Sequence, residues 1–356
     1  MKALNWQVQM DLPCGRTGAA SRRMPRLIRK AGNTARMEGE EHMQMTARTK
    51  RGDTYFGKLR KDMVRDRWLY LMLIPGALFF ILFKYLPMGG IILAFKDYSP
   101  FLGIFKSPNV GLANFQKLFT DPDFFRLFRN TLILAVYSIV FTFPIPIIIA
   151  LMLNEIQHES YKRVMQSIIY LPHFLSWVVA VSITYILLSN QSGIVNDLIA
   201  ACGGKSVNFL GSQSWFRPLI TLQVIWKETG WGTIVYLAAL TGVDVQLYEA
   251  ATVDGANRWQ QLIHVTLPAI KSTIVVLFIL RMGTFLDNGF DQLFLMVNSL
   301  NRNIGDVFDT YVYNAAMVNG QFSYSTTVGI FKSVVSLVLV LLTNKLANLM
   351  GEEGVY

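Results

Sequence analysis

The sequence contains few of the residues that build metal, redox or nucleophilic sites. Only two cysteines and four histidines occur among 356 residues. Cys14 and Cys202 lack the close spacing of a zinc or redox motif, and the histidines form no H-x-x-x-H pair. No G-x-S-x-G string is present. We therefore expect neither a metal site nor a catalytic residue in this chain.

A complete nucleotide-binding loop is also missing. The string Gly203-Gly204-Lys205-Ser206 matches the end of the pattern G-x-x-x-x-G-K-[ST], but the first glycine would have to stand at position 199, where the chain has Ile199. The predicted location of this string is outside the cell, away from ATP. We therefore expect no nucleotide or other cofactor bound to this chain.

Charged residues are scarce and unevenly distributed. They make up 16% of the chain against 52% hydrophobic residues, and the mean hydropathy is +0.36, which is typical of polytopic membrane proteins. Residues 1–67 hold sixteen Lys or Arg and seven Asp or Glu, whereas the rest of the chain holds seventeen and sixteen. The net charge of +10 therefore belongs almost entirely to a basic tail, and it gives no reason to expect nucleic acid as a partner.

The distribution of apolar runs predicts a membrane topology. Residues 1–67 lack an apolar core of signal-peptide length and are predicted to be a cytoplasmic, partly disordered tail. Six apolar segments follow within 68–349, near residues 68–95, 131–153, 168–188, 218–241, 272–296 and 326–349. The loops 154–167 and 242–271 and the end 350–356 would lie inside, and the loops 96–130, 189–217 and 297–325 outside. This topology places Cys14 and Cys202 on opposite sides of the membrane, which would exclude a disulfide between them.

A polar, helix-compatible stretch at 249–268 separates two of these segments. Asp244 is placed to cap a first helix, Gly255 to form a turn, and Pro268 to mark the start of a new segment. Each helix would have about ten to twelve residues, too few to cross a bilayer. The apolar positions expected to share a face are Val243, Leu247, Tyr248 and Ala251 in the first helix, and Trp259, Leu262, Ile263 and Leu267 in the second. Such a pair of helices suits docking on a partner, and a hairpin lying on the membrane surface is the alternative.

The same stretch carries a family signature. Membrane permeases of binding-protein-dependent ABC importers share E-A-A, three residues, G, nine residues and I-x-L-P. The chain resembles them at Glu249-Ala250-Ala251, Gly255 and Leu267-Pro268, with Val265 in place of isoleucine. The resemblance implies an all-α membrane protein of six transmembrane helices with the type I, MetI-like architecture. It also implies a cytoplasmic coupling loop that docks on an ATPase, formed by Glu249, Ala250, Ala251, Asp254, Gly255, Leu267 and Pro268.

Further strings are similar to the carbohydrate branch of this family, the LplB-type permeases. They are Phe83–Phe95 followed by Lys96-Asp97-Tyr98, then Tyr170–Pro172 and Thr310–Tyr313. They imply an oligosaccharide as cargo and a bacterial inner or plasma membrane as location, with both chain ends in the cytoplasm. The implied partners are ABC ATPase subunits that use ATP, a second, different permease, an extracellular solute-binding protein and membrane lipids. A peptide or an amino acid is the alternative cargo, and an ion-coupled secondary transporter is the alternative machine.

Prolines interrupt several of the predicted helices. Pro75 and Pro87 fall in the first segment, Pro144 and Pro146 in the second, and Pro172 in the third. Because proline removes a backbone donor and clashes with the preceding turn, we expect bends at these positions. Such breaks are common in transporters, and packing geometry alone is the alternative reason for them.

Two polar groups within the apolar segments are candidates for the cargo path. Trp226, Lys227 and Glu228 lie in the middle of the fourth segment, where a ring beside hydrogen-bonding groups could bind a sugar. Alternatively, Lys227 and Glu228 point to different helix faces and each pairs with another helix.

The second group lies in the fifth segment. Asn288, Asp291 and Gln292 are spaced three to four residues apart and are expected on one helix face, lining the path. Alternatively they lie at the outer membrane boundary, and Gly283 and Gly289 then suggest a close helix crossing. Arg281 and Lys332 are also charged residues in apolar surroundings, and the sequence assigns them no role.

Overall fold

The structure is a computed structural model that describes residues 64–351 and Gly354. Within this part every regular element is a helix, and the only bridge between extended residues joins Lys96 to Asn109. The predicted all-α class is therefore confirmed. Residues 1–63 of the predicted tail lie outside the described residues, as do Glu352, Glu353, Val355 and Tyr356 at the other end.

The described residues divide into two compact units, residues 64–83 and the residues from Lys84 onward. In the first unit, α3 (Arg67–Phe80) contains Pro75 in its interior and buries none of its side chains. Its apolar residues are exposed, Met72 most of all. A helix that is apolar on all sides and buries nothing is suited to contact with lipid.

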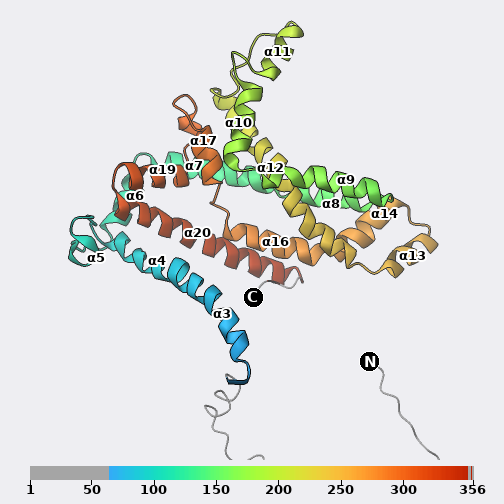
Figure 1. Cartoon of the computed structure of the whole chain (residues 1–356), viewed down its shortest axis with the longest axis horizontal. Helices are drawn as coiled ribbons and strands as arrows, with labels where there is room; N and C mark the ends of the chain where they lie inside the picture. Colours follow the sequence, from blue (N-terminus) through green and yellow to red (C-terminus); the bar gives the residue numbers. More distant parts are fainter. Residues whose placement is uncertain (1–63, 352–353, 355–356) are drawn as a thin grey trace, which may run out of the picture. The chain divides into compact units, whose positions relative to one another are not determined.

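The second unit holds the remaining helices. In chain order they are α4 (Leu86–Met88), α5 (Gly103–Lys106), α6 (Ala113–Thr120), α7 (Phe124–Tyr137), α8 (Pro144–Asn154), α9 (Glu159–Tyr170), α10 (Trp177–Leu188), α11 (Ile194–Ala201), α12 (Gln213–Thr241), α13 (Val245–Val253), α14 (Arg258–Gln261), α15 (Leu267–Ala269), α16 (Lys271–Gly283), α17 (Phe290–Met296), α18 (Arg302–Gly305), α19 (Phe308–Tyr313) and α20 (Phe322–Leu349). Figure 1 shows α20 beside α16, and α12 packs along α8. These two pairings hold the middle of the unit together.

Three helical stretches are long and apolar enough to span a membrane: Arg67–Phe95, Phe124–Asn154 and Phe322–Leu349. Two bent pairs, Glu159–Phe174 with Trp177–Leu188 and Arg258–Ala269 with Lys271–Gly283, could each form one more. The 29-residue α12 is long enough to cross, but it carries Arg217, Lys227 and Glu228 and is not among these stretches. The number six therefore stays a prediction.

Two of the predicted spans are not continuous helices. In the third, the 3-10 turn Leu171–Phe174 ends before Ser176, whose hydroxyl caps α10, and the helices on either side differ in direction by 100°. In the fifth, α16 ends at Gly283, and α17 begins only after Gly289, whose φ is +77°. Hydropathy averaged over a window detects neither break because a few residues of irregular backbone hardly change the average.

Three helices widen into a π turn just before a proline. The π turns Ile81–Tyr85, Ser138–Thr142 and Leu262–Thr266 each end two residues before a proline, namely Pro87, Pro144 and Pro268. A proline cannot donate to the preceding turn and its ring crowds that turn, so a wider turn relieves the clash. Of the predicted bends, the one near Pro172 is confirmed by the 100° change of direction after the 3-10 turn Leu171–Phe174. Pro87 and Pro144 each follow a π turn, whereas Pro75 and Pro146 lie within regular helix.

The closest helix approach is not where the glycines of the fifth segment predicted it. A methyl group on Gly230 of α12 would lie 2.3 Å from the Ile169 carbonyl oxygen, so α12 touches the end of α9 backbone to backbone. The expectation for Gly283 and Gly289 is wrong, because a methyl group there would meet nothing closer than 3.4 Å and 3.9 Å, respectively. Gly230 therefore fixes where α12 crosses the 100° bend.

An aromatic cluster closes one end of the second unit. Its buried residues are Leu118, Phe124, Leu127, Phe308, Ala315, Tyr324 and Val328. Beside it, the Asp121 carboxylate accepts hydrogen bonds from the hydroxyls of Tyr311 (3.0 Å) and Tyr324 (2.6 Å). One loop carboxylate therefore ties together elements that are 190 or more residues away in the chain.

Candidate functional site

The polar stretch folds as the predicted pair of helices, which we call the hairpin (residues 244–269). The Asp244 carboxylate accepts a hydrogen bond of 2.9 Å from the Gln246 amide at the start of α13. Gly255 has φ +78°, a conformation that favours glycine. The cap and the turn expected from the sequence are therefore confirmed.

The second arm of the hairpin begins with a reciprocal cap. The Asn257 side chain accepts a hydrogen bond from the Gln260 amide (2.9 Å), and the Gln260 side chain accepts one from the Asn257 amide (2.8 Å). The arm then continues as α14, a π turn and α15 up to Ala269. This capping box fixes the angle at which the chain leaves the turn.

Side chains brace the two arms against each other. The Tyr248 hydroxyl lies 3.0 Å from the Thr266 hydroxyl, and the Gln261 amide donates to the Thr252 hydroxyl (3.0 Å). The same Gln261 amide donates to the Ala256 carbonyl oxygen (3.1 Å). Side-chain hydrogen bonds therefore fix both starts of the arms, join the arms to each other and hold the turn.

Most of the signature residues are exposed on the hairpin, whereas Leu267 lines its inner side. Glu249, Ala250, Asp254, Gly255 and Pro268 are exposed, and Ala251 and Leu267 are half-buried. Ala251, Asp254 and Gly255 line a hollow of about 260 Å³ together with Gln260, Gln261 and His264. The Glu249 carboxylate has no hydrogen bond or ion pair within the described residues, so it is available to another molecule.

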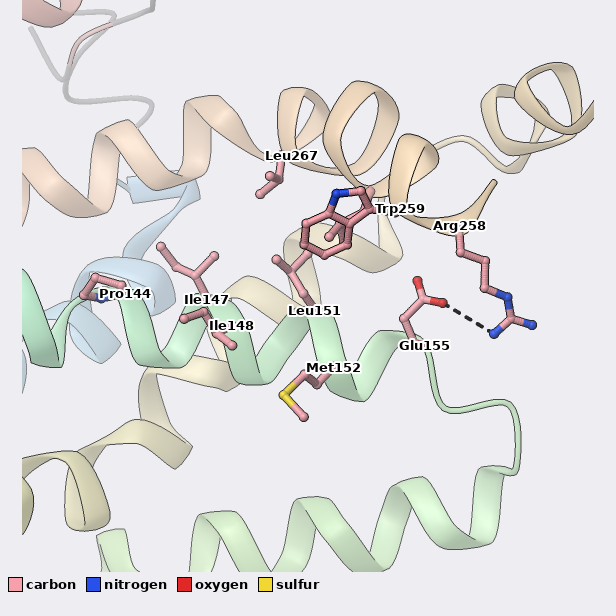
Figure 2. Close-up of a pocket in the computed structure, with 10 residues that line it drawn as sticks. Pro144, Ile147, Ile148, Leu151, Met152, Glu155, Arg258, Trp259 and Leu267 are labelled. Atoms are coloured by element: carbon pink, nitrogen blue, oxygen red, sulfur yellow. Dashed lines mark ion pairs between the residues drawn. The ribbon is translucent and has the colours of Figure 1, made fainter. Parts of the chain in front are cut away.

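The inner side of the second arm faces α8 across an apolar groove of about 510 Å³. Figure 2 shows Trp259 and Leu267 pointing toward α8. At one end Glu155 and Arg258 form an ion pair of 3.8 Å, and both side chains are well exposed. Such a pair contributes little, and the rest of the groove is lined almost entirely by apolar side chains.

A second cavity, of about 240 Å³, lies between α7, α12, α16 and α17, and we call it the inner pocket. Eight polar or charged residues and five others line it, namely Ser138, Thr142, Thr221, Glu228, Arg281, Asp287, Asn288 and Gln292, with Leu134, Trp177, Ile220, Val224 and Gly289. Of the six path candidates, Glu228, Asn288 and Gln292 line this pocket. Trp226, with 46% of its surface exposed, lies elsewhere, and so do Lys227 and Asp291.

Lys227 and Glu228 bind the same turn. The Lys227 ammonium lies 3.0 Å from the Glu228 carboxylate and 3.0 Å from the His173 carbonyl oxygen, and the other Glu228 oxygen lies 2.9 Å from His173 Nδ1. The expectation that the two side chains diverge and pair with different helices is therefore wrong. Lys227 and Glu228 meet because both side chains extend to His173 in the 3-10 turn Leu171–Phe174, which packs against α12.

The bend is further held by aromatic rings. The Lys227 ammonium lies 5.1 Å from the centre of the Trp177 ring, and the His173 ring stacks on Trp231 at 5.0 Å. A cation over an indole face is attracted by the ring quadrupole. Lys227 and Glu228 thus hold the bend between α9 and α10. Glu228 also lines the inner pocket.

Asn288, Asp291 and Gln292 do not share a helix face, which corrects the sequence prediction. Asn288 precedes α17, in the irregular segment that ends at Gly289, and it donates to the Thr131 carbonyl oxygen (3.2 Å). Asp291 is exposed, whereas Gln292 is fully buried. The left-handed Gly289 breaks the periodicity on which the prediction depended.

Gln292 is held firmly but incompletely. Its amide nitrogen donates to the Ile220 carbonyl oxygen (2.9 Å) and to the Gln223 side-chain oxygen (2.7 Å). Its own side-chain oxygen has no hydrogen-bond partner among the described residues. A buried acceptor left without a donor costs about 1–3 kcal/mol. The side-chain oxygen of Gln292 is therefore a buried hydrogen-bond acceptor without a donor among the described residues.

Two further charged residues line the inner pocket, Arg281 and Asp287; the sequence showed Asp287 beside the polar group of the fifth segment and Arg281 as a charge to which it assigned no role. Arg281 Nη2 donates to the Ser138 hydroxyl (2.6 Å), and Asp287 lies 2.7 Å from the Lys332 ammonium, which also contacts Asp309. Their charge in an apolar segment was the available signal, but no pattern in the sequence brings Ser138 and Lys332 to the same place.

Known proteins resemble the chain over most of its length. It is 54% identical over 299 residues to the polygalacturonan/rhamnogalacturonan transport system permease protein YteP of Bacillus subtilis, covering 84% of this chain and 93% of that protein. Protein LplB of the same organism is 54% identical over 292 residues, covering 82% and 92%.

A solved structure and a family model agree with these relatives. A chain in the crystal structure of a bacterial alginate ABC transporter, in complex with an alginate pentasaccharide-bound periplasmic protein, superposes with a TM-score of 0.77 at 40% identity, covering 84% of this chain and all of that one. The model of the binding-protein-dependent transport system inner membrane component matches residues 124–351, which include the hairpin and the inner pocket. The chain therefore belongs to the family of inner membrane components of binding-protein-dependent transport systems.

Proposed function

We propose that this chain is the permease subunit of an ATP-driven importer that carries a carbohydrate, in the form of an oligosaccharide, across a bacterial inner membrane. The names of its relatives support the cargo class: they denote transport of polygalacturonan, rhamnogalacturonan and arabinooligosaccharides, and the superposed chain comes from an alginate importer. A peptide or amino acid cargo has no such support.

The observation that carries the mechanism is the braced hairpin. It presents Glu249, Ala250, Asp254, Gly255 and Pro268 outward, with Ala251 and Leu267 half-buried beside them, and its arms are held by side-chain hydrogen bonds. A hairpin lying on a bilayer surface would present one continuous apolar face. Here exposed carboxylates alternate with exposed apolar side chains such as Val253. This mixture favours a protein partner, and we assign that role to the ATPase.

In the proposed assembly, the chain pairs with a second permease, two ATPase subunits dock on the hairpins, and an extracellular binding protein delivers the cargo to the outer loops. The chain binds no ATP itself, and both of its ends lie in the cytoplasm. When ATP draws the ATPase subunits together, the hairpin follows as a rigid body and shifts the membrane helices between inward- and outward-facing states.

The inner pocket is the proposed contact with the cargo. It combines hydrogen-bonding side chains with the Trp177 ring, a mixture that suits a sugar with its hydroxyls and its apolar faces. Its volume of about 240 Å³ is below the ~300–1,000 Å³ of most ligand pockets, so it would hold part of an oligosaccharide chain at a time.

Co-purification from cells that express the tagged chain with its neighbouring genes tests this proposal. We expect an ATPase and a second membrane protein to remain bound in mild detergent, and the reconstituted complex to take up oligosaccharides when ATP is present. If no ATPase is retained although the chain is inserted and folded, the importer assignment is wrong.

A further inference from the structure

The apolar groove between α8 and the second arm of the hairpin, which we call the α8 groove, is open although its walls are apolar. Of the ten residues that line it, eight are apolar and two, Glu155 and Arg258, are charged. Trp259 points across the groove toward α8 but keeps 68% of its surface exposed (Figure 2). Met152 on the opposite wall is also exposed. A continuous exposed apolar surface of this kind marks an interaction site.

The α8 groove has the length of one leaflet of a bilayer. The eleven residues of its wall α8 rise about 16 Å, which is half of the ~30 Å hydrocarbon core. α8 is the last part of the stretch Phe124–Asn154, which is apolar and long enough to span a membrane. The second arm belongs to a bent pair that could form a further span. The α8 groove therefore runs from the middle of the bilayer to one of its boundaries.

This length distinguishes between two kinds of occupant. A transmembrane helix of a partner subunit crosses both leaflets and would need a groove about twice as long. An acyl chain of a phospholipid extends through one leaflet only and is apolar along its whole length. The α8 groove therefore fits a lipid chain better than a partner helix.

Both charges of the α8 groove lie at the same end, where α8 ends. Arg258 Nη1 and Glu155 Oε2 are 3.8 Å apart, farther than the about 2.7–2.9 Å of a charge-assisted hydrogen bond. Because both side chains are well exposed, each can bind another charged group. Trp259 follows Arg258 directly, and tryptophan is enriched at the level of the lipid headgroups. This end of the groove therefore suits a headgroup at the membrane boundary.

The pair of opposite charges also selects among headgroups. The planar fork of Arg258 matches the oxygens of a phosphate. The Glu155 carboxylate can accept hydrogen bonds from a primary ammonium, whereas a quaternary ammonium has no N–H group to donate. The pair is therefore complementary to phosphatidylethanolamine, which carries a phosphate and a primary ammonium. Phosphatidylcholine matches only Arg258.

We propose that the α8 groove binds phosphatidylethanolamine of the cytoplasmic leaflet, with one acyl chain along α8, the phosphate at Arg258 and the ammonium at Glu155. The acyl chain fills the gap between α8 and the inner side of the hairpin, and the outer side of the hairpin stays free for the ATPase. The choice of leaflet rests on the proposed function, because that function places the hairpin in the cytoplasm.

Fluorescence quenching tests the inference. The tagged chain, purified in detergent with the subunits that it retains, is titrated with phosphatidylethanolamine or phosphatidylcholine. Both lipids carry the same brominated acyl chains, which quench the tryptophans that they touch. The difference between the wild type and Trp259→Phe isolates the signal of Trp259 from that of the other tryptophans. We expect saturable quenching, with phosphatidylethanolamine bound about three- to tenfold more tightly, the effect of one charged hydrogen bond at an exposed site.

Two variants separate the roles of the charges. Glu155→Gln should abolish the preference for phosphatidylethanolamine, whereas Arg258→Gln should weaken the binding of both lipids alike, since both carry the phosphate. Glu159→Gln is the matched control. Glu159 also forms an exposed ion pair with an arginine, Arg163 of α9 (3.1 Å), but neither residue lines the α8 groove. The control should leave the preference unchanged.

Two results would overturn the inference. Trp259 would not be quenched if a helix of a partner subunit filled the α8 groove. The wild type would bind both lipids equally if lipids only surrounded the chain without recognition of their headgroups.

The binding measurement does not depend on transport, so the failure of this inference can be told from that of the proposed function. If the lipid preference is found but the purified complex takes up no carbohydrate, the proposed function fails and the lipid site stands. If the complex imports carbohydrate but the wild type shows no lipid preference, only the lipid site fails.

Discussion

The hairpin and the inner pocket are built in opposite ways. The hydrogen bonds that cap and brace the hairpin lie within residues 244–269, and the braces join side chains at most 18 residues apart. The pocket depends on distant pairs, since Arg281 and its partner Ser138 are 143 residues apart. A local unit can move as one piece without breaking the membrane bundle. A site assembled from four helices changes shape whenever those helices move, which is what alternating access requires of a cargo site.

The largest effect is expected from the turn of the hairpin. Gly255→Val forces a β-branched side chain into the left-handed region, which costs roughly 1–2 kcal/mol, so the turn should rearrange. Because the strain is confined to a local unit, we expect uptake near background with normal membrane insertion and a normal thermal unfolding midpoint.

Gly203→Val provides the matched control for the turn. Gly203 also has a positive φ of +81° and open space around it, but it lies in the loop after α11. It should leave uptake close to that of the wild type. A Gly255 variant that transports normally would mean that the hairpin does not transmit force.

The second largest effect is expected from the ion pairs of Lys332 with Asp287 and Asp309, beside the inner pocket. Lys332→Met leaves Asp287 and Asp309 without their shared cation, and the less exposed Asp309 makes this change costly. Breaking a buried pair from one side destabilises a protein by about 3 kcal/mol. Lys332→Met should therefore lose uptake and also unfold at a lower temperature than the wild type in detergent. Gly255→Val should lose uptake without a change of the unfolding temperature.

The double variant Lys332→Met with Asp309→Asn checks the cause. Because it removes the unpaired charge as well, it should recover much of the lost stability. If the double variant is no more stable than the single one, the ion pair does not hold α19 to α20.

This contrast also explains what the sequence could predict. The cap at Asp244 and the turn at Gly255 are local features, and local patterns predicted them correctly. The coupling role of the signature residues stays a prediction. The partners of Lys227 and Glu228 were predicted wrongly because the 100° bend that brings His173 beneath α12 depends on tertiary packing. Arg281 could be seen as a charge in an apolar run, but its pocket could not, since Gly289 ends the helical periodicity.

A smaller effect is expected from the braces of the hairpin. Gln261→Ala removes the hydrogen bonds to Thr252 and Ala256, each worth about 1 kcal/mol. The hairpin should still bind the ATPase, but it should transmit less of the ATPase movement to the membrane helices. We therefore expect more ATP to be hydrolysed for each sugar imported. Gln246→Ala, the same change on an exposed position of α13, should leave that ratio unchanged. Equal ratios in both variants would show that rigidity within the hairpin is unnecessary.

The smallest effect concerns pH and Asp121 beside the aromatic cluster, another assembly of distant residues. Burial alone would raise the pKa of the Asp121 carboxyl, but hydrogen bonds from Tyr324, the Asp123 amide and Tyr311 outweigh it, and the pKa is lowered below its usual value. A carboxyl whose folded pKa is depressed stabilises the fold above its unfolded pKa of about 3.9, and this contribution is lost as the pH falls through the folded pKa. The thermal unfolding midpoint of the wild type should therefore exceed that of Asp121→Asn at pH 7, and the two should converge in acid below about pH 4. If the difference between the two unfolding midpoints were the same at pH 7 and in acid, the charge of the Asp121 carboxylate would not stabilise the cluster. Hydrogen bonds between distant residues would then contribute less to this cluster than to the inner pocket.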